Sequence, residues 1–239
     1  MYGGNLLMSI GGNIDSVQNR INGACMRVGR DASEVTLLCV SKTKPLSDLL
    51  EAYKAGARVF AENKVQELTA KMPEMPEDVE WHLIGHLQTN KVKYIVGKVA
   101  LIHSVDSLHL AEEINKQAEK NGCVQPVLIE INVAGEESKF GTSDLESNAE
   151  LIRSVSELKN LKLMGLMTIA PYVENPEENR VYFRKLKEFL YSDEVRGYFP
   201  ERPVLSMGMT GDFEVAVEEG ATHVRVGTGI FGERDYGKL

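Results

Sequence analysis

The sequence predicts an α/β fold: a single (β/α)8 TIM-like barrel that fills residues 1–239 and carries one additional N-terminal helix. The length of 239 residues is close to the roughly 250 residues typical of such barrels. Short β-rich runs alternate with helix-period segments along the whole chain, and no shift in composition marks a second domain. An open, doubly wound sheet is the alternative, because alternation alone does not prove closure.

Eight short runs rich in β-branched and aliphatic residues are the expected strands. Several are nearly continuous apolar runs, as in parallel strands that are covered on both faces. The runs are Val35–Ser41, Ala57–Ala61, Glu80–Ile84, Ala100–Val105, Pro126–Val133, Leu161–Ile169, Pro203–Met207 and Thr222–Val226.

Amphipathic segments lie between these strands, and one at about Ile14–Val28 precedes the first strand as the additional helix. The segment Ser107–Lys120 ends at Asn121–Gly122, and Asp212–Glu219 ends at Gly220, a residue type suited to a helix end. The expected buried face of the Ser107–Lys120 helix consists of Leu108, Ala111, Ile114 and Ala118.

A further helix is expected to begin at a capping box formed by Ser143 and Glu146, a pair that satisfies two backbone N–H groups of the first turn. The expected buried stripe of this helix consists of Leu145, Ala149, Ile152 and Val155.

The charge balance argues against nucleic acid as a partner. The chain has 27 Lys and Arg against 35 Asp and Glu, a net charge of −8, and such a surface repels phosphate backbones. Lys91, Lys93 and Lys98 are a local exception, for which a solvated lysine face is a simpler interpretation than an anion site.

Cysteine usage and hydropathy predict a soluble, cytoplasmic protein. Cys25, Cys39 and Cys123 are odd in number and show no CxxC spacing, which argues against a disulfide framework. We see neither a secretory signal nor an apolar run near the ~20 residues of a membrane helix.

Lys42 is the most informative residue at the ends of the expected strands. In a barrel of this kind, functional side chains lie at the C-terminal ends of the strands. Alternation places Leu38, Val40 and Lys42 on one face, so that Lys42 would lie above an apolar plug. Desolvation there would lower the lysine pKa and favour Schiff-base chemistry. The alternative from spacing alone is a lysine that snorkels into solvent.

The loops after the last two strands have the composition of a phosphate site. They run from Ser206 to Gly211 and from Gly227 to Gly229, and barrels frequently bind phosphate at this position. Glycines let the backbone approach an anion, and the hydroxyls of Ser206 and Thr228 can donate to it. Together with Lys42, these loops suit a phosphorylated aldehyde, although each alone could be a tight turn.

Arg225 is expected to point into the barrel, because Val224 and Val226 take the helix-facing side of the last strand. A buried arginine needs a partner, so we expect a carboxylate or a ligand ring nitrogen nearby. Opposite a pyridine nitrogen, Arg225 would keep that nitrogen unprotonated and weaken the ring as an electron sink.

Two motifs match the patterns of a dinucleotide site and a metal site, but the residues around them argue against both. Gly227–Gly232 satisfies G-x-G-x-x-G, yet only seven residues follow it, so the acidic residue of a dinucleotide site is missing. His82 and His86 lie at a strand-to-loop junction without a glutamate between them. We therefore expect structural histidines and no metal site.

Seven segments in order along the chain resemble the pyridoxal phosphate homeostasis protein family. They are Leu37–Pro45, Glu62–Glu67, Trp81–Lys91, His103–Ser107, Gly165–Met167, Leu205–Met209 and Val224–Thr228.

The resemblance implies the alanine-racemase-like barrel of fold-type III proteins that bind pyridoxal 5′-phosphate (PLP). It implies that Lys42 forms the aldimine, that Ser206, Gly227 and Thr228 bind the phosphate, that Arg225 lies beside the pyridine nitrogen, and that Asn63 is near the cofactor. Two departures from the family pattern, Ala61 for glycine and Thr210 for serine, remove none of these residues.

The resemblance also implies a monomer that buffers PLP or delivers it to apo PLP-dependent enzymes. Racemases with a similar barrel add a β-domain and a catalytic tyrosine, for which this chain has no room, so we expect no independent catalytic activity. A racemase-like enzyme acting on a small amino acid remains the alternative, and an aldolase-like Schiff-base enzyme for a sugar phosphate is a third hypothesis.

Overall fold

A closed, eight-stranded parallel barrel is the core of the structure, a computed structural model that describes residues 9–135, 141 and 144–233. The strands pair in sequence order, and β8 pairs with β1 through Thr36↔His223 and Cys39↔Val226. This pairing confirms the barrel and excludes the open sheet. The strands are β1 Thr36–Val40, β2 Val59–Glu62, β3 Glu80–Leu83, β4 Leu101–Val105, β5 Gln125–Glu130, β6 Leu161–Met167, β7 Val204–Met209 and β8 His223–Val226.

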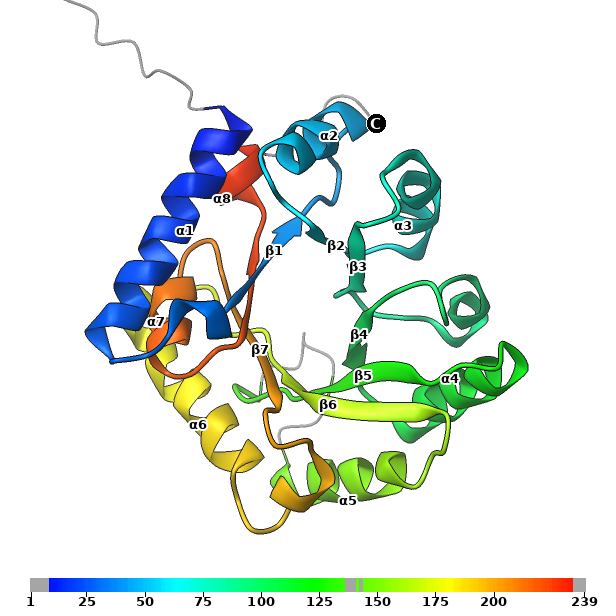
Figure 1. The fold of residues 1–239 in the computed structure, drawn as a ribbon. Helices are drawn as coiled ribbons and strands as arrows, with labels where there is room; N and C mark the ends of the chain where they lie inside the picture. The colour runs from blue at the N-terminus through cyan, green and yellow to red at the C-terminus, as the bar shows by residue number, and fades with distance from the viewer. Residues whose placement is uncertain (1–8, 136–140, 142–143, 234–239) are drawn as a thin grey trace, which may run out of the picture.

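Helices surround the barrel as an outer layer (Figure 1). They are α1 Ile10–Arg27, α2 Leu46–Lys54, α3 Val65–Lys71, α4 Leu108–Lys120, α5 Leu145–Ser156, α6 Arg180–Leu190, α7 Phe213–Glu218 and α8 Thr228–Phe231. Between β3 and β4 the chain forms a 3-10 helix, η3 Thr89–Tyr94. Short 3-10 segments also occur at η1 Ala32–Glu34, η2 Met72–Glu74, η4 Pro176–Asn179 and η5 Arg196–Tyr198.

The core has an outer and an inner part, as the period-2 alternation of buried strands requires. The outer part lies between strands and helices and includes Cys39, Phe60 and Val226. The inner part contains two separate apolar clusters. One consists of Leu38, Val40, Ala61 and Ile84, and the other of Leu101, Leu128, Met167 and Val204.

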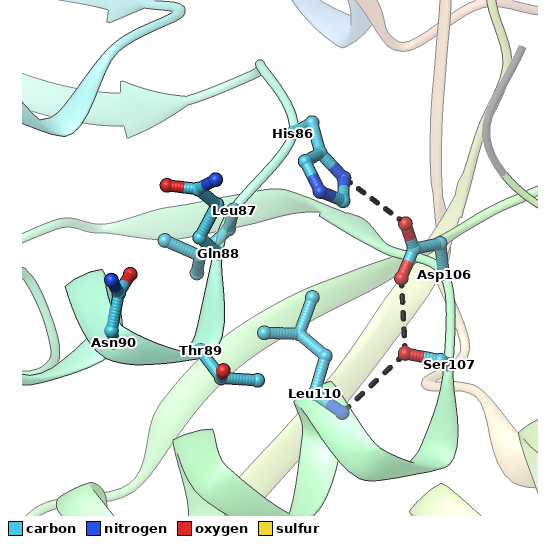
Figure 2. A pocket seen from close by; sticks show the side chains of 8 residues that line it. All are labelled: His86, Leu87, Gln88, Thr89, Asn90, Asp106, Ser107 and Leu110. Carbon is cyan, nitrogen blue, oxygen red and sulfur yellow. Dashed lines mark hydrogen bonds and ion pairs between the residues drawn. The ribbon is translucent and has the colours of Figure 1, made fainter.

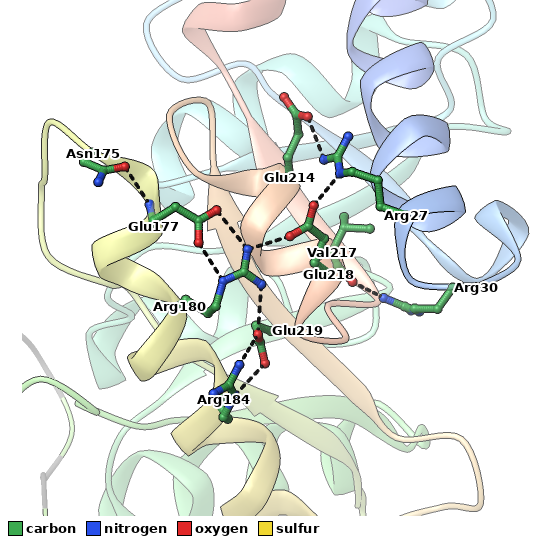
Figure 3. A network of polar contacts seen from close by, with 10 residues as sticks. All are labelled: Arg27, Arg30, Asn175, Glu177, Arg180, Arg184, Glu214, Val217, Glu218 and Glu219. Carbon is green, nitrogen blue, oxygen red and sulfur yellow. Dashed lines mark hydrogen bonds and ion pairs between the residues drawn. The ribbon is translucent and has the colours of Figure 1, made fainter.

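The N-terminal helix α1 completes the outer layer where the last two helices are short. Figure 1 shows α1 beside α7 and α8, which have six and four residues. Arg27 joins α1 to α7 through ion pairs of 2.5 Å to Glu218 and 3.0 Å to Glu214, and Arg180 of α6 reaches Glu218 at 2.6 Å (Figure 3). Because Arg27 is half exposed, each of its pairs contributes at most about 1 kcal/mol, and the three-helix connection matters more than any single pair.

Two expected helix starts need correction. Asp144, not Ser143, caps α5, because its carboxylate accepts from the N–H of Ser147; Ser143 lies outside the described residues. Leu145 and Leu108 are exposed by more than a third, as first residues of α5 and α4. The other residues of both expected stripes are buried, so the apolar periodicity overestimated burial only at the first residue of each helix. Ser107 caps α4, and Gly122 follows it with φ +62°.

Within the described part of the chain, no helix combines the length and the apolar character needed to cross a membrane. Cys25, Cys39 and Cys123 are all free thiols.

Candidate functional site

A cavity of about 680 Å³ opens at the C-terminal ends of the strands. Its volume is in the range of small-molecule sites. Five of the six predicted cofactor residues line it: Lys42, Asn63, Arg225, Gly227 and Thr228. Lys42 and Asn63 follow β1 and β2, Arg225 lies in β8, and Gly227 and Thr228 come directly after β8. β8 is distant in sequence from β1 but pairs with it in the closed barrel.

Lys42 enters the cavity because of the strand that precedes it. Leu38 and Val40 point into the barrel, and Val40 and Lys42 both line the cavity. The side chain of Lys42 is only partly exposed, so it does not simply extend into solvent. The neighbouring Lys44 is directed elsewhere, since its Nζ donates to the carbonyls of Phe231 and Glu233, each at 2.7 Å.

Arg225 is 5% exposed and points inward, as predicted. Its Nη1 donates to Ser206 Oγ at 2.7 Å, and its Nη2 donates to the Thr168 carbonyl at 2.8 Å. Burial lowers the pKa of Arg225 to about 10, although the carboxylates of Asp212 and Glu130 act in the opposite direction. The guanidinium is therefore a charged, donor-only group at neutral pH.

Ser206 lies beneath the cavity and does not line it. It is fully buried, and its hydroxyl contacts Arg225 and, at 2.9 Å, Nδ1 of His103. The register between β7 and β8 shifts between Ser206 and Met209, and such an irregularity redirects the side chains that follow. As a result, Thr210 is the β7-loop hydroxyl that lines the cavity.

The two glycine-containing loops form one connected wall. Thr210, Gly211, Gly227 and Thr228 all line the cavity, and Thr210 Oγ1 accepts from the N–H of Gly229 at 3.3 Å. Gly208 allows this path: its φ is +89°, and a Cβ there would lie 2.5 Å from that of Ala216. The wall offers two hydroxyls and close backbone approach, which suits an anion.

Asn63 is positioned by a close approach between two loops. A Cβ on Gly85 would lie 2.3 Å from the Asn63 carbonyl oxygen, so only glycine lets the loop after β3 pack on the end of β2. Both residues line the cavity.

Three histidines lie inside the barrel next to the groups that hold Arg225, and no motif in the sequence indicated this arrangement. Nδ1 of His82 lies 2.8 Å from Nε2 of His103, which reaches Ser206, and His223 stacks on His82 at 5.9 Å. Burial lowers the pKa of His82 to about 3 and that of His223 to about 4. Burial likewise holds the pKa of His103 well below its usual value. All three histidines are therefore neutral at pH 7, and Ser206 connects Arg225 to uncharged imidazole side chains.

His86 lines a second hollow of about 450 Å³, which His82 does not line (Figure 2). Its Nδ1 lies 3.2 Å from Asp106, whose other oxygen accepts from Ser107 at 3.1 Å. His86 lines both hollows. The two histidines therefore do not share a site, and the described residues contain no group of three or more His, Cys, Asp or Glu placed to hold a metal.

The rim contains residues that sequence reasoning missed. Glu130 at the end of β5 and Tyr172 after β6 line the cavity, and Tyr172 is 96% exposed. The position of these loops at the C-terminal ends of strands was the available signal. Elsewhere on the surface, Lys93 and Lys98 are exposed, and Lys91 and Lys93 flank the ring of Tyr94.

Comparison with known proteins places this geometry in a family. The family model for the alanine racemase N-terminal domain matches residues 13–235. A pyridoxal phosphate homeostasis protein of Aquifex aeolicus is 54% identical over 224 residues, which cover 93% of this chain and 97% of the relative. The protein of that name from Escherichia coli is 40% identical over 231 residues, covering 95% and 97%. The chain belongs to the pyridoxal phosphate homeostasis protein family.

Solved structures agree with this assignment. The chain matches PipY of Synechococcus elongatus with PLP bound at 36% identity and a TM-score of 0.77, covering 90% of this chain and all of PipY. A protein of unknown function from Bifidobacterium adolescentis matches at 37% identity and a TM-score of 0.85, covering 93% and 94%. An alanine racemase of Clostridium difficile shares the fold at 15% identity and a TM-score of 0.74, and this chain covers 59% of it.

Proposed function

We propose that this protein binds PLP and acts in PLP homeostasis, with Lys42 as the residue that holds the cofactor covalently. The observation that carries the proposal is the cavity itself, which brings one amine, one buried guanidinium and a wall of glycines and threonines together. An amine, a ring-nitrogen partner and a phosphate site are the three features that PLP requires. The relatives' names and the PLP bound to PipY support the same ligand.

The residues present fit PLP by the chemistry of their donors. Lys42 Nζ would take the aldehyde, Arg225 would face the ring nitrogen, and Thr228, Gly227 and Thr210 would hold the phosphate. Asn63 lies beside Lys42 along the cavity wall. Ser206 was predicted to bind the phosphate directly; its buried position supports instead an indirect role through Arg225.

The same residues favour a carrier over an independent enzyme. Bound PLP supplies an aldehyde for amines and a ring that can accept electrons. Arg225 remains charged and donates two hydrogen bonds to the protein, so it stabilises an unprotonated ring nitrogen and keeps the ring a poor electron sink. We therefore propose that the protein buffers PLP or delivers it to apo PLP-dependent enzymes. We also propose that it is a single-domain, monomeric, cytosolic protein.

The absorption spectrum and the transfer of PLP test this function. We expect purified protein mixed with PLP to develop a visible band of the lysine-bound cofactor at one equivalent, and the loaded protein to activate an apo PLP-dependent enzyme. We expect negligible turnover of common amino acids. Robust turnover of a small amino acid would favour the racemase-like enzyme, and failure to take up PLP would reject the proposed function.

A further inference from the structure

A charged cluster outside the cavity contacts the backbone on both sides of Lys42. It consists of Glu62 at the end of β2 and of Glu67 and Lys71 on α3. Lys71 Nζ lies 2.8 Å from Glu62 Oε1 and 3.1 Å from Glu67 Oε2. Glu62 is fully buried, and Lys71 has only 12% of its side chain exposed. Charged groups this far from water are costly unless they are paired.

The cluster holds the two peptide groups that flank the Cα of Lys42. Lys71 Nζ donates to the Ser41 carbonyl at 2.9 Å, and that carbonyl belongs to the peptide group before Lys42. The N–H of Thr43, in the peptide group after Lys42, donates to Glu67 Oε2 at 2.7 Å. Ser41 Oγ also donates to Glu62 at 2.6 Å. The backbone rotation of Lys42 is thus restrained from both sides by one set of side chains.

The backbone beside Lys42 is strained in a way that requires such support. Thr43 has φ +64° and is the one non-glycine residue with positive φ among the described residues. β-Branched residues rarely adopt this conformation, and such strain persists only where neighbouring contacts impose it. The hydrogen bond from Thr43 to Glu67 is such a contact.

We propose that Glu67, Lys71 and Glu62 are positioning residues that aim Lys42 Nζ at the aldehyde of the ligand, an inference that rests on the proposed function. In the step they assist, Nζ as the free amine adds to the aldehyde carbon. A C=N bond replaces C=O, and the oxygen leaves as water with the two amine hydrogens. These residues act on Lys42 through its backbone, which sets the direction of the side chain.

Glu67 variants separate positioning from general stability. Glu67→Leu removes the acceptor for Thr43 but leaves Lys71 paired with Glu62, and Glu67→Gln retains an oxygen that can accept. Misalignment of a reacting group by about 1 Å can slow a step about a hundredfold. We therefore expect Glu67→Leu to slow covalent PLP capture by about ten- to a hundredfold, Glu67→Gln to recover most of the rate, and the exposed control Glu74→Leu to match the wild type.

Pyridoxine 5′-phosphate supplies the readout that a loss of folding alone could not mimic. It has the ring and the phosphate of PLP but no aldehyde, so its dissociation constant reports the cavity without Lys42 chemistry. We expect this dissociation constant to stay within about twofold of wild type in all three variants. The fraction of each protein that binds pyridoxine 5′-phosphate gives the concentration of folded protein, by which its rate of PLP capture is normalised.

The outcomes are distinct. Wild-type protein that binds neither compound would reject the proposed function. Normal capture by Glu67→Leu, equal slowing by Glu67→Gln and Glu67→Leu, or parallel losses of capture and of pyridoxine 5′-phosphate binding would overturn positioning. If Glu67→Leu does not fold, the comparison of Glu67→Gln with Glu67→Asp decides: both keep an acceptor, but the shorter Asp should capture PLP more slowly.

Discussion

The Lys42 and Arg225 sides of the cavity show two ways of preparing a cation for a ligand. At Lys42 the protein restrains the backbone with a paired, charged cluster and directs the side chain into the cavity. At Arg225 it restrains the guanidinium itself with the neutral groups Ser206 and Thr168. Backbone restraint sets the direction of a reacting amine, whereas an arginine that only recognises a ring nitrogen benefits from rigid support of its guanidinium. The contrast predicts different responses to mutation and to pH.

The largest effect is expected on PLP affinity from the phosphate wall. Thr210→Ala combined with Thr228→Ala removes two hydroxyls, each contributing about 1.5–3 kcal/mol if it donates to a charged phosphate. If the effects add, the dissociation constant should rise by about two to four powers of ten in a titration. Ser206→Ala is the matched control: if its hydroxyl acts through Arg225, affinity should fall less and the binding of inorganic phosphate should not change.

Acid should destabilise the Arg225 side of the cavity before the Lys42 side. The pKa of His82 is about 3 and that of His223 about 4, both below the 6.5 of an unfolded histidine. The unfolded chain therefore binds more protons below pH 6.5, and stability is lost as pH falls from there toward the folded pKa values. Between pH 7 and pH 5 each histidine should cost about 2 kcal/mol of unfolding free energy.

Urea unfolding at the two pH values measures this loss. His223→Gln should reduce the difference by about a third if the three buried histidines, His82, His103 and His223, act independently, and the same substitution of the exposed His109 serves as the control. An equal pH dependence in both variants would show that other groups cause the acid sensitivity.

Removing Lys71 from the charged cluster should cost more stability than removing the hydrogen bond between Glu67 and Thr43. Lys71→Met leaves the buried Glu62 without its cation, and the loss of one partner of a buried pair typically costs about 3 kcal/mol or more. Burial already raises the pKa of Glu62, with Lys71 and Ser41 acting against it, so the variant should lose stability as pH rises and Glu62 ionises. Chemical denaturation at pH 5 and pH 8 should show the larger deficit at pH 8; equal deficits would contradict a charged Glu62.

The smallest effect concerns the strain at Thr43. Thr43→Gly relieves a left-handed conformation that costs about 1–2 kcal/mol, while glycine adds roughly 0.5–1 kcal/mol of backbone entropy to the unfolded chain. The unfolding free energy should change by less than about 1 kcal/mol. A larger loss of stability would mean that the threonine side chain, and not the backbone conformation, is what this position requires.

The sequence predicted the features that depend on local pattern. Strand alternation placed Lys42 and Arg225 inside the barrel, and the rule that function gathers at strand ends identified Gly227 and Thr228. The family resemblance added Asn63, and all of these residues line the cavity. The sequence did not indicate that Ser206 lies beneath the cavity, because the register shift between β7 and β8 has no sequence signature of its own. It missed the histidine chain and the Glu62–Lys71 cluster, since both depend on contacts between elements that only the closed barrel brings together.

Reduction of the PLP-loaded protein with borohydride, followed by peptide mapping, identifies the lysine that binds PLP. Reduction converts a lysine-bound aldehyde into a stable pyridoxyl amine whose position mass spectrometry can assign. We expect one pyridoxyl group, on Lys42, and none in Lys42→Ala protein treated in the same way. Lys44 should remain unlabelled because its ammonium is bound to the carbonyls of Phe231 and Glu233. Stoichiometric label on Lys44 or on the exposed Lys64, with Lys42 unmodified, would contradict the assignment.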